Sequence, residues 1–501
     1  MSMLSQEAGE QGEHTLKRSL GAVNLVTLGI GAVIGAGIFT LTGQAAALRA
    51  GPAVALSFVV AGLTCAFAGL CYAEFASIIP IAGSAYTYGY ATLGELVAWI
   101  IGWDLTLEYA FGASTVASGW AGYFNSLLQQ FHIYLPPQIT ATTGTPLAFY
   151  HGQWMQVMSL PPGVSDAGLP HATGVINLIA VAIVMVITTI LVIGIKESAN
   201  FNSAVVIVKV SIVGVFLVVG GWYLFTHPEV ARLNWHPFVP PPDGHGNFGW
   251  GGIPTAAASI FFAYIGFDAV STAAQEAKNP ERDMPIGILG SLVVCTILYI
   301  LVSLVLTGLV SYKTLNVSAP VALAIDATGV GWGSLLVKIG AVFGLATVML
   351  VMLLGQTRVF YSMSKDGLLP RWASAVHPRF RTPWITTIVF GAFAAIMPAF
   401  FNIDVLSELV NIGTLLAFTI VSAGVWVLRV RHPEIKRPFR TPLVPLVPIL
   451  GILSAVYLMT RLMLFTWEVM IGWLIFGLII YFTYSVKHSK VQRMAKVQAA
   501  D

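Results

Sequence analysis

Apolar runs of about 20 residues recur along almost the whole chain, and they constrain its fold more than any other feature. A helix that crosses a bilayer needs such a run, because the hydrocarbon core holds no water to bond free backbone groups. The sequence therefore predicts an all-α membrane protein with twelve transmembrane helices. The predicted spans are 22–48, 53–79, 93–124, 173–195, 202–225, 253–276, 286–311, 332–362, 383–401, 406–429, 442–463 and 467–486.

The composition supports this class and excludes several others. Only 9% of the 501 residues are Asp, Glu, Lys or Arg, and 56% are apolar, whereas soluble domains carry about 25% charged residues. Disordered, nucleic-acid-binding and coiled-coil proteins need far more charge, so we expect no nucleic-acid partner. The three cysteines lie inside apolar stretches without a metal-binding spacing. We interpret them as buried thiols.

Basic residues predict how the chain is oriented in the membrane. Cytoplasmic loops carry an excess of Lys and Arg, and an internal N-terminus places most of the 25 basic residues on the cytoplasmic side. The 131–172 loop has no Lys or Arg, which fits an external position. We therefore expect a multi-pass protein of the cell membrane, with both termini cytoplasmic. The tails are 1–21, which lacks the apolar core of a signal peptide, and the basic 487–501.

Two predicted spans contain glycine where a continuous helix disfavours it by about 1 kcal/mol per residue. The first span has four glycines within 29–37, and the sixth has Gly266 two residues before Asp268. These are the first spans of two five-helix halves, at 22–225 and 253–429. Gly-interrupted spans at matching places in two halves are typical of inverted-repeat transporters with discontinuous helices 1 and 6. The alternative is that small residues merely let helices pack closely.

The ends of a broken helix suit opposite charges. Free N–H groups at the start of the second half-helix, here at Gly35 to Gly37, suit a carboxylate. Carbonyl groups at the end of a first half-helix suit an ammonium group. A zwitterionic α-amino acid carries both charges close together, so the pattern predicts a midplane site for such a solute. The candidate carbonyls are those of Val33, Phe262, Ala263 and Ile265.

Three ionisable side chains, Glu108, Lys209 and Asp268, lie deep inside predicted spans. Such residues are rare in membranes and are functional candidates by default. A buried lysine can exchange its proton, and a fixed ammonium group can replace a bound Na⁺. We therefore assign proton coupling to these three residues, with Lys209 as the main one. The alternatives are a structural Lys209 neutralised by Asp268 or Glu108, and a structural Glu108 with satisfied hydrogen bonds.

Nearly the whole chain resembles the cationic amino acid transporters of the amino acid, polyamine and organocation (APC) superfamily. The closest resemblance is to bacterial proton-coupled members. It implies a five-plus-five inverted repeat followed by two further helices, at 442–486. The motifs that carry it are residues 29–39, 71–76 (CYAEFA), 83–88 (GSAYTY), 102–109 (GWDLTLEY), 262–268 (FAYIGFD), 279–285 (NPERDMP), 355–358 (GQTR) and 366–370 (DGLLP).

The resemblance also implies a substrate site and a coupling ion. Lys209 would occupy the place where sodium-coupled relatives bind Na⁺, which implies H⁺ as the coupling ion and no Na⁺, metal or other cofactor. Relatives often have a hydroxyl residue in place of Ala36, and the bulky Met352 leaves less room for an Arg or Lys substrate. We therefore expect small neutral amino acids such as alanine as well as cationic ones. The residues implied to line the site are Val33, Gly35, Ala36, Gly37, Phe262, Ala263, Ile265 and Met352.

These observations predict secondary active transport of L-amino acids, by H⁺-coupled symport with alternating access. The expected partners are the L-amino acid and the lipid bilayer. We expect no enzyme and no catalytic residue, because the chain lacks the H-E-x-x-H and G-x-S-x-G motifs. Two alternatives use the same pocket, namely an amino acid exchanger (antiporter) and a transport-dead amino-acid sensor.

Overall fold

The computed structural model describes most of the chain, and the described residues are mostly helical. The predicted tails at 1–21 and 487–501, and the 83–88 motif, lie largely outside them. The described residues are 20–78, 86, 88–90, 93–150, 153–157, 160, 164–194, 199–268, 270–271, 274 and 277–490.

The helices account for most of the described chain. Up to residue 234 they are α2 (Ala22–Val33), the π-helix η1 (Gly37–Leu41), α3 (Thr42–Ala45), the π-helix η2 (Ala46–Ala50), η3 (Gly51–Ala53), α4 (Val54–Ile78), α6 (Glu95–Gln130), η4 (Pro137–Ile139), α7 (Leu178–Ile193), α8 (Ala199–Thr226) and α9 (Pro228–Asn234). They continue with α10 (Gly249–Ile260), the 3₁₀-helix η6 (Phe261–Tyr264), α11 (Pro280–Leu309), η8 (Tyr312–Thr314), α12 (Pro320–Asp326), α13 (Gly331–Lys365), η9 (Arg371–Ser374), α14 (Trp384–Phe400), α15 (Ile403–Arg431), α16 (Leu446–Met459), α17 (Leu464–Ile480), η10 (Tyr481–Ser485) and α18 (Val486–His488).

Each predicted span contains helix in the structure, which makes the protein a largely α-helical membrane protein. The count of twelve crossings, the inverted repeat and the division at 22–225, 253–429 and 442–486 stay predictions. By length and apolar composition alone, six stretches of the described chain could cross a membrane. They are Gly37–Ile78, Val205–Thr226, Pro280–Leu309, Gly331–Lys365, Ile403–Arg431 and Leu464–His488.

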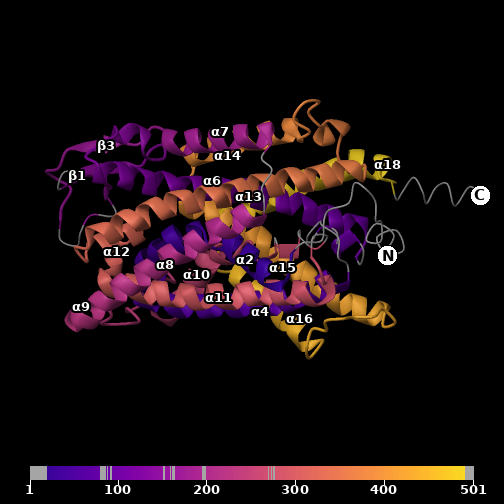
Figure 1. Cartoon of the computed structure of the whole chain (residues 1–501), viewed down its shortest axis with the longest axis horizontal. Coiled ribbons are helices and arrows are strands. Elements are labelled where there is room, and N and C mark those ends of the chain that lie inside the picture. The colour runs from indigo at the N-terminus through magenta and orange to yellow at the C-terminus, as the bar shows by residue number, and fades with distance from the viewer. Residues whose placement is uncertain are drawn as a thin grey trace, which may run out of the picture.

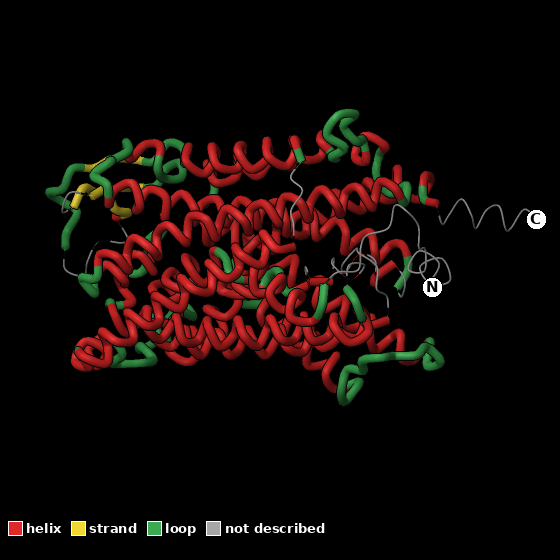
Figure 2. Tube along the Cα trace, in the orientation of Figure 1, coloured by secondary structure: helices red, strands yellow, loops and turns green. Residues whose placement is uncertain are grey.

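The long helices run roughly along the long axis of the molecule (Figures 1 and 2). Elements α9, α12, β1 and β3 lie at one end, which we call the sheet end, and α18 lies at the opposite end. Along the axis α13 packs against α6, while α11 packs against both α4 and α2. The predicted topology places the sheet end outside the cell.

The 131–172 segment, which we expected to be a loop, instead contains a small antiparallel sheet. Its strands are β1 (Pro146–Tyr150), β2 (Gln153–Gln156) and β3 (His171–Thr173), in the order β2-β1-β3. Leu147 lies opposite Gln156 on one side and Ala172 on the other. Aromatic residues in this segment favour strands, and the ring centroids of Phe149 and Trp154 are 5.2 Å apart. The high Pro and Gly content hid this signal.

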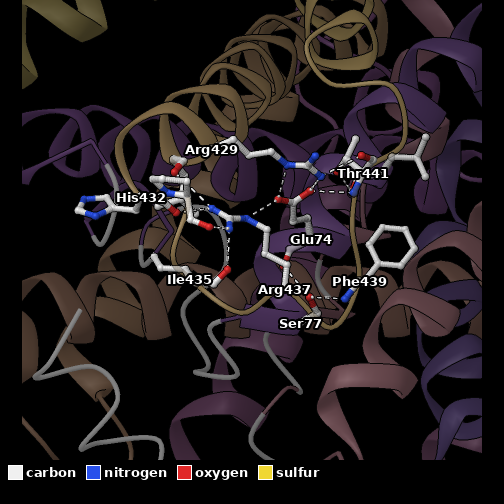
Figure 3. A network of polar contacts seen from close by, with 11 residues as sticks. Glu74, Ser77, Arg429, His432, Ile435, Arg437, Phe439 and Thr441 are labelled. Carbon is white, nitrogen blue, oxygen red and sulfur yellow. Dashed lines mark hydrogen bonds and ion pairs between the residues drawn. The ribbon is translucent and has the colours of Figure 1, made fainter.

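A buried carboxylate near the end of α4 ties together α4, α15 and the segment before α16 (Figure 3). Glu74, whose side chain is fully buried, accepts hydrogen bonds from Arg429 Nε at 3.1 Å and Nη2 at 2.7 Å. It also accepts from the Thr441 N–H at 2.8 Å, and Arg437 Nε lies 3.3 Å from its other oxygen. A buried charge is tolerated only when it is paired and hydrogen-bonded, so these contacts fix the three segments relative to one another.

Candidate substrate-binding site

The first predicted span is interrupted at the expected place. Helix α2 ends at Val33, Ile34 has an extended backbone conformation (φ −71°, ψ 101°), and helical structure resumes at Ala36 and Gly37. Gly35 lies at the break, where an added Cβ would lie 3.2 Å from Val348 Cγ2 on α13. The N–H groups at the start of the second segment have no intrahelical partner, because they precede its first turn.

The sixth predicted span is interrupted as well. Helix α10 gives way to the 3₁₀-helix η6, and Ile265 is extended (φ −63°, ψ 131°). Gly266 follows with a φ of +117°, a left-handed conformation that favours glycine. An added Cβ at Gly266 would lie 2.9 Å from the Ala32 carbonyl carbon and oxygen, so glycine also permits the close approach to α2. Both predicted discontinuities are therefore confirmed.

The two breaks meet each other at a backbone-to-backbone contact. An added Cβ at Gly37 would lie 2.2 Å from Ala263 Cα, so η1 and η6 approach as closely as glycine allows. The Tyr299 hydroxyl of α11 lies between the two breaks, 2.8 Å from the Val33 carbonyl oxygen and 2.7 Å from that of Ala263. Two of the four carbonyls predicted to face an ammonium group thus lie around a single hydroxyl.

That geometry leaves one of the two carbonyl oxygens without the tyrosine's hydrogen. A phenol has one hydrogen, so Tyr299 donates to only one of the two carbonyls at a time. The other carbonyl oxygen can accept a hydrogen bond from a bound ammonium group without displacing the tyrosine. The Phe262 carbonyl accepts the Ile265 N–H at 3.2 Å, within the turn that ends η6.

Lys209 of α8 reaches the same break from another direction. Its Nζ donates to the Gly31 carbonyl at 2.8 Å and to the Ile34 carbonyl at 3.4 Å, and the residue is 2% exposed. Backbone carbonyls at the end of α2 therefore hold the ammonium group. The alternative in which Asp268 or Glu108 balances its charge stays a prediction.

The acidic residues lie buried on neighbouring elements. Glu108 of α6 and Asp268 after η6 are 1% and 3% exposed. Glu108 Oε1 has no hydrogen-bond partner among the described residues, which does not fit the alternative of a fully satisfied structural carboxylate. Asp104, one turn earlier on α6, is also buried, and both of its oxygens lack a described partner. An added Cβ at Gly413 would lie 2.8 Å from Asp104 Oδ1, which places this carboxylate against α15.

The remaining predicted residues lie near the breaks. Ala36 faces α6, since an added Cβ at Gly119 would lie 3.6 Å from its Cβ. Met352 of α13 also faces α6, and an added Cβ at Gly112 would lie 3.4 Å from its sulfur. The candidate lining residues thus belong to α2, η1, η6, α13 and the two interruptions. All of them, Val33, Gly35, Ala36, Gly37, Phe262, Ala263, Ile265 and Met352, are buried.

Sequence reasoning missed Tyr299. The residue lies in an apolar span, where we searched only for charged groups and glycines. A tyrosine in the middle of a span would have been a usable signal, because a buried hydroxyl needs a hydrogen-bond partner and lipid offers none.

Two interrupted helices that meet inside a helical membrane protein, with carbonyls and a lysine turned to the breaks, define a membrane solute transporter. The comparison with known families agrees with this class. The chain belongs to the amino acid permease family, whose model matches residues 20–483.

Individual relatives carry different solute names. The branched-chain amino acid permease of Bacillus subtilis (strain 168) is 47% identical over 97% of each chain. The methylthioribose transporter of the same organism is 45% identical over 96% of each chain. The vacuolar cationic amino acid transporter 4 of Arabidopsis thaliana is 39% identical over 84% of this chain and 65% of its own. The resemblance to cationic amino acid transporters within the APC superfamily is therefore confirmed.

Proposed function

We propose that this chain is a secondary active transporter that carries L-amino acids across the cell membrane together with H⁺, by alternating access. The observation that carries the proposal is the meeting of two broken helices at Tyr299, with Lys209 bound to the carbonyls at the end of α2. The Val33 carbonyl proposed for the substrate and the Gly31 and Ile34 carbonyls that hold Lys209 all lie at the end of α2.

The substrate is proposed to bind by its two charged groups. Tyr299 donates its single hydrogen to the carbonyl of either Val33 or Ala263, and the ammonium group of the substrate donates to the other one. Its carboxylate accepts from the N–H groups at the start of the second half of helix 1, from Gly35 to Gly37. Ala36 adds no hydroxyl, so the backbone alone holds the carboxylate. Binding draws the two breaks together, and one helix bundle then rocks against the other.

Lys209 is proposed to couple this movement to the proton. Protonated, it donates to Gly31 and Ile34 and fixes the end of α2. A neutral amine holds these carbonyls less strongly, because it loses the charge that strengthens the hydrogen bonds. Release of the proton would thus free the first half-helix to move. A positive charge at this place also removes the need for Na⁺, and no other cofactor is proposed.

The side chain of the substrate is proposed to lie beside α13, where Val348 faces Gly35 at the break and Met352 faces Gly112 of α6. A methionine there suits small and branched neutral side chains better than Arg or Lys. We therefore rank neutral amino acids, from alanine to the branched-chain residues, ahead of cationic ones.

Purified protein in proteoliposomes tests the function. Uptake of labelled alanine, isoleucine, arginine and methylthioribose is measured with an inward H⁺ gradient, and again with the same amino acid preloaded inside. We expect gradient-driven uptake of a neutral amino acid. Uptake that requires preloading would favour an exchanger, and binding without flux would favour a sensor. Neither binding nor uptake of any amino acid would contradict the proposal.

A further inference from the structure

An open groove lies beside the start of α11, away from the two broken helices. Its volume is about 580 Å³, within the range of pockets that hold small ligands. One wall is formed by the first turns of α11, where Arg282, Ile286 and Leu289 line it. The other wall is formed by Pro438 and Phe439, in the segment before α16. We call this feature the α11 groove.

Hydrogen bonds hold both walls of the α11 groove in place. At the start of α11 the Asp283 carboxylate accepts the Asn279 N–H at 3.2 Å, which fixes the first turn. On the other wall the Phe439 N–H donates to Ser77 Oγ of α4 at 3.4 Å, next to the Glu74 network (Figure 3). The groove is therefore a preformed part of the surface.

The α11 groove lies at the predicted cytoplasmic side of the membrane. Helix α11 leads to α12 at the sheet end, so it begins at the opposite end of the molecule (Figure 1). From the groove, exposed apolar side chains continue along α11 toward the sheet end with the spacing of one helix face. An exposed apolar stripe of this kind marks contact with lipid chains. It consists of Ile286, Val293, Ile297 and Leu301.

Basic side chains gather at the predicted cytoplasmic end of the groove. Arg282 is exposed and takes part in none of the ion pairs between described residues. Lys436 and Arg440, both exposed, flank the residues of the opposite wall in the sequence. Glu281 adds a carboxylate to the lining. The positive charges outnumber it, so the rim favours an anionic ligand.

We propose that the α11 groove binds an anionic phospholipid of the cytoplasmic leaflet. Arg282 donates to the phosphate group, because a guanidinium group can bind phosphate through two parallel hydrogen bonds. One acyl chain lies in the groove against Ile286 and Phe439 and continues along the exposed stripe of α11. A soluble anion would gain nothing from that stripe, and a zwitterionic lipid would gain less from the basic rim.

The bound lipid stabilises the helix that carries Tyr299. Helix α11 packs against both α2 and α4, so a lipid at its start acts on the folded bundle as a whole. This proposal does not depend on which solute the protein transports.

Heat stability of the purified, delipidated protein tests the site. The midpoint of thermal unfolding is measured in detergent while phosphatidylglycerol is added in increasing amounts. The titration is repeated with phosphatidylcholine of the same acyl chains and with soluble glycerol phosphate. Arg282→Gln removes the charge, and Ile286→Trp fills the groove from an exposed position. Arg431→Gln, at an exposed arginine near the end of α15, is the matched control for loss of a positive charge.

We expect phosphatidylglycerol to raise the unfolding midpoint of the wild type and of Arg431→Gln until the site is saturated, because a ligand of the folded state stabilises it. The half-maximal lipid concentration should rise about tenfold in Arg282→Gln, the value of one hydrogen bond to a charged group. Ile286→Trp should weaken the response as well. Phosphatidylcholine should act more weakly in the wild type, and glycerol phosphate should have no effect.

Three results would overturn the proposal. They are equal stabilisation by the two lipids, an unchanged response to phosphatidylglycerol in Arg282→Gln or in Ile286→Trp, and stabilisation by glycerol phosphate alone. Each of them would leave the proposed function intact, since no amino acid is bound or transported in this experiment.

Discussion

The Tyr299 hydroxyl lies within 2.8 Å of two carbonyl oxygens from different broken helices but has one hydrogen to give them. Tyr299→Phe keeps the ring and removes that donor. We expect substrate affinity to fall about tenfold, because the backbone geometry around the ammonium group loosens, while stability falls by about 1 kcal/mol. Binding of the transported amino acid to purified protein gives the affinity.

Tyr481→Phe is the matched control. Tyr481 is also buried, but its hydroxyl donates to Glu95 Oε1 at 3.2 Å, at the start of α6 and away from the breaks. It should cost similar stability and leave affinity unchanged. Equal effects of the two variants on affinity would show that Tyr299 is only a packing residue.

Met352 is expected to set the size of the accepted side chain. Met352→Ala removes the sulfur that faces Gly112 and should raise uptake of isoleucine or arginine relative to alanine. Burial of a methionine side chain is worth about 2 kcal/mol. The ratio of isoleucine or arginine uptake to alanine uptake can therefore change about tenfold or more. Met363→Ala, a buried methionine of the same helix that faces Gly102 instead, should leave the ratio unchanged. An unchanged uptake ratio in Met352→Ala would show that Met352 does not contact the substrate side chain.

At the scale of residues, the sequence identified the buried ionisable groups, because such groups are rare in apolar spans. Lys209, Glu108 and Asp268 stand out in apolar spans, and all three are buried in the structure. Their partners could not be predicted, because a lysine can be held by carbonyls as well as by carboxylates and the sequence does not show which backbone is unwound beside it. Lys209 binds Gly31 and Ile34 for that reason.

Among the elements, the contact between η1 and η6 leaves no space for a side chain. Gly37→Val would put a Cβ 2.2 Å from Ala263 Cα, so the broken helices would have to separate. We expect uptake to be lost. Gly221→Val in α8, where an added Cβ meets nothing within 4 Å, should transport normally. The measurement is uptake by each variant, reconstituted into liposomes at equal amounts of protein. Normal transport by Gly37→Val would contradict the close contact between η1 and η6.

The Glu74 network should matter for stability more than for substrate choice. Glu74→Ala leaves the buried guanidinium of Arg437 without its carboxylate and frees the Thr441 N–H. Breaking a buried pair from one side costs about 3 to 5 kcal/mol, so the temperature of thermal inactivation should drop sharply. Arg431→Ala, an exposed residue at the end of α15, serves as the control. A Glu74→Ala protein as heat-stable as Arg431→Ala would show that the network is dispensable.

Element positions followed from apolar run length, and the two interruptions followed from glycine. The small sheet at 146–173 was missed because short strands give a weak signal within Pro- and Gly-rich sequence. The Glu74 network was also out of reach, since its members are more than 350 residues apart in the chain.

For the whole molecule, the sequence predicted a helical membrane protein and an amino acid transporter family, and both are shown. A polar cavity of about 560 Å³ near the sheet end could not be predicted. Its lining comes from segments near residues 40, 125, 330 and 404, and each contributes polar residues that look like ordinary helix ends or loops. Only their packing turns them into one cavity.

The most direct test of the account is whether an H⁺ gradient alone drives accumulation of a neutral amino acid through Lys209. Wild-type and Lys209→Ala proteins are compared in proteoliposomes with an inward gradient, with and without a proton ionophore, and in exchange mode. The account predicts that the wild type accumulates the amino acid above equilibrium until the ionophore is added, and that Lys209→Ala exchanges but does not accumulate. Two results would contradict the account: accumulation that the ionophore does not abolish, and full accumulation by Lys209→Ala.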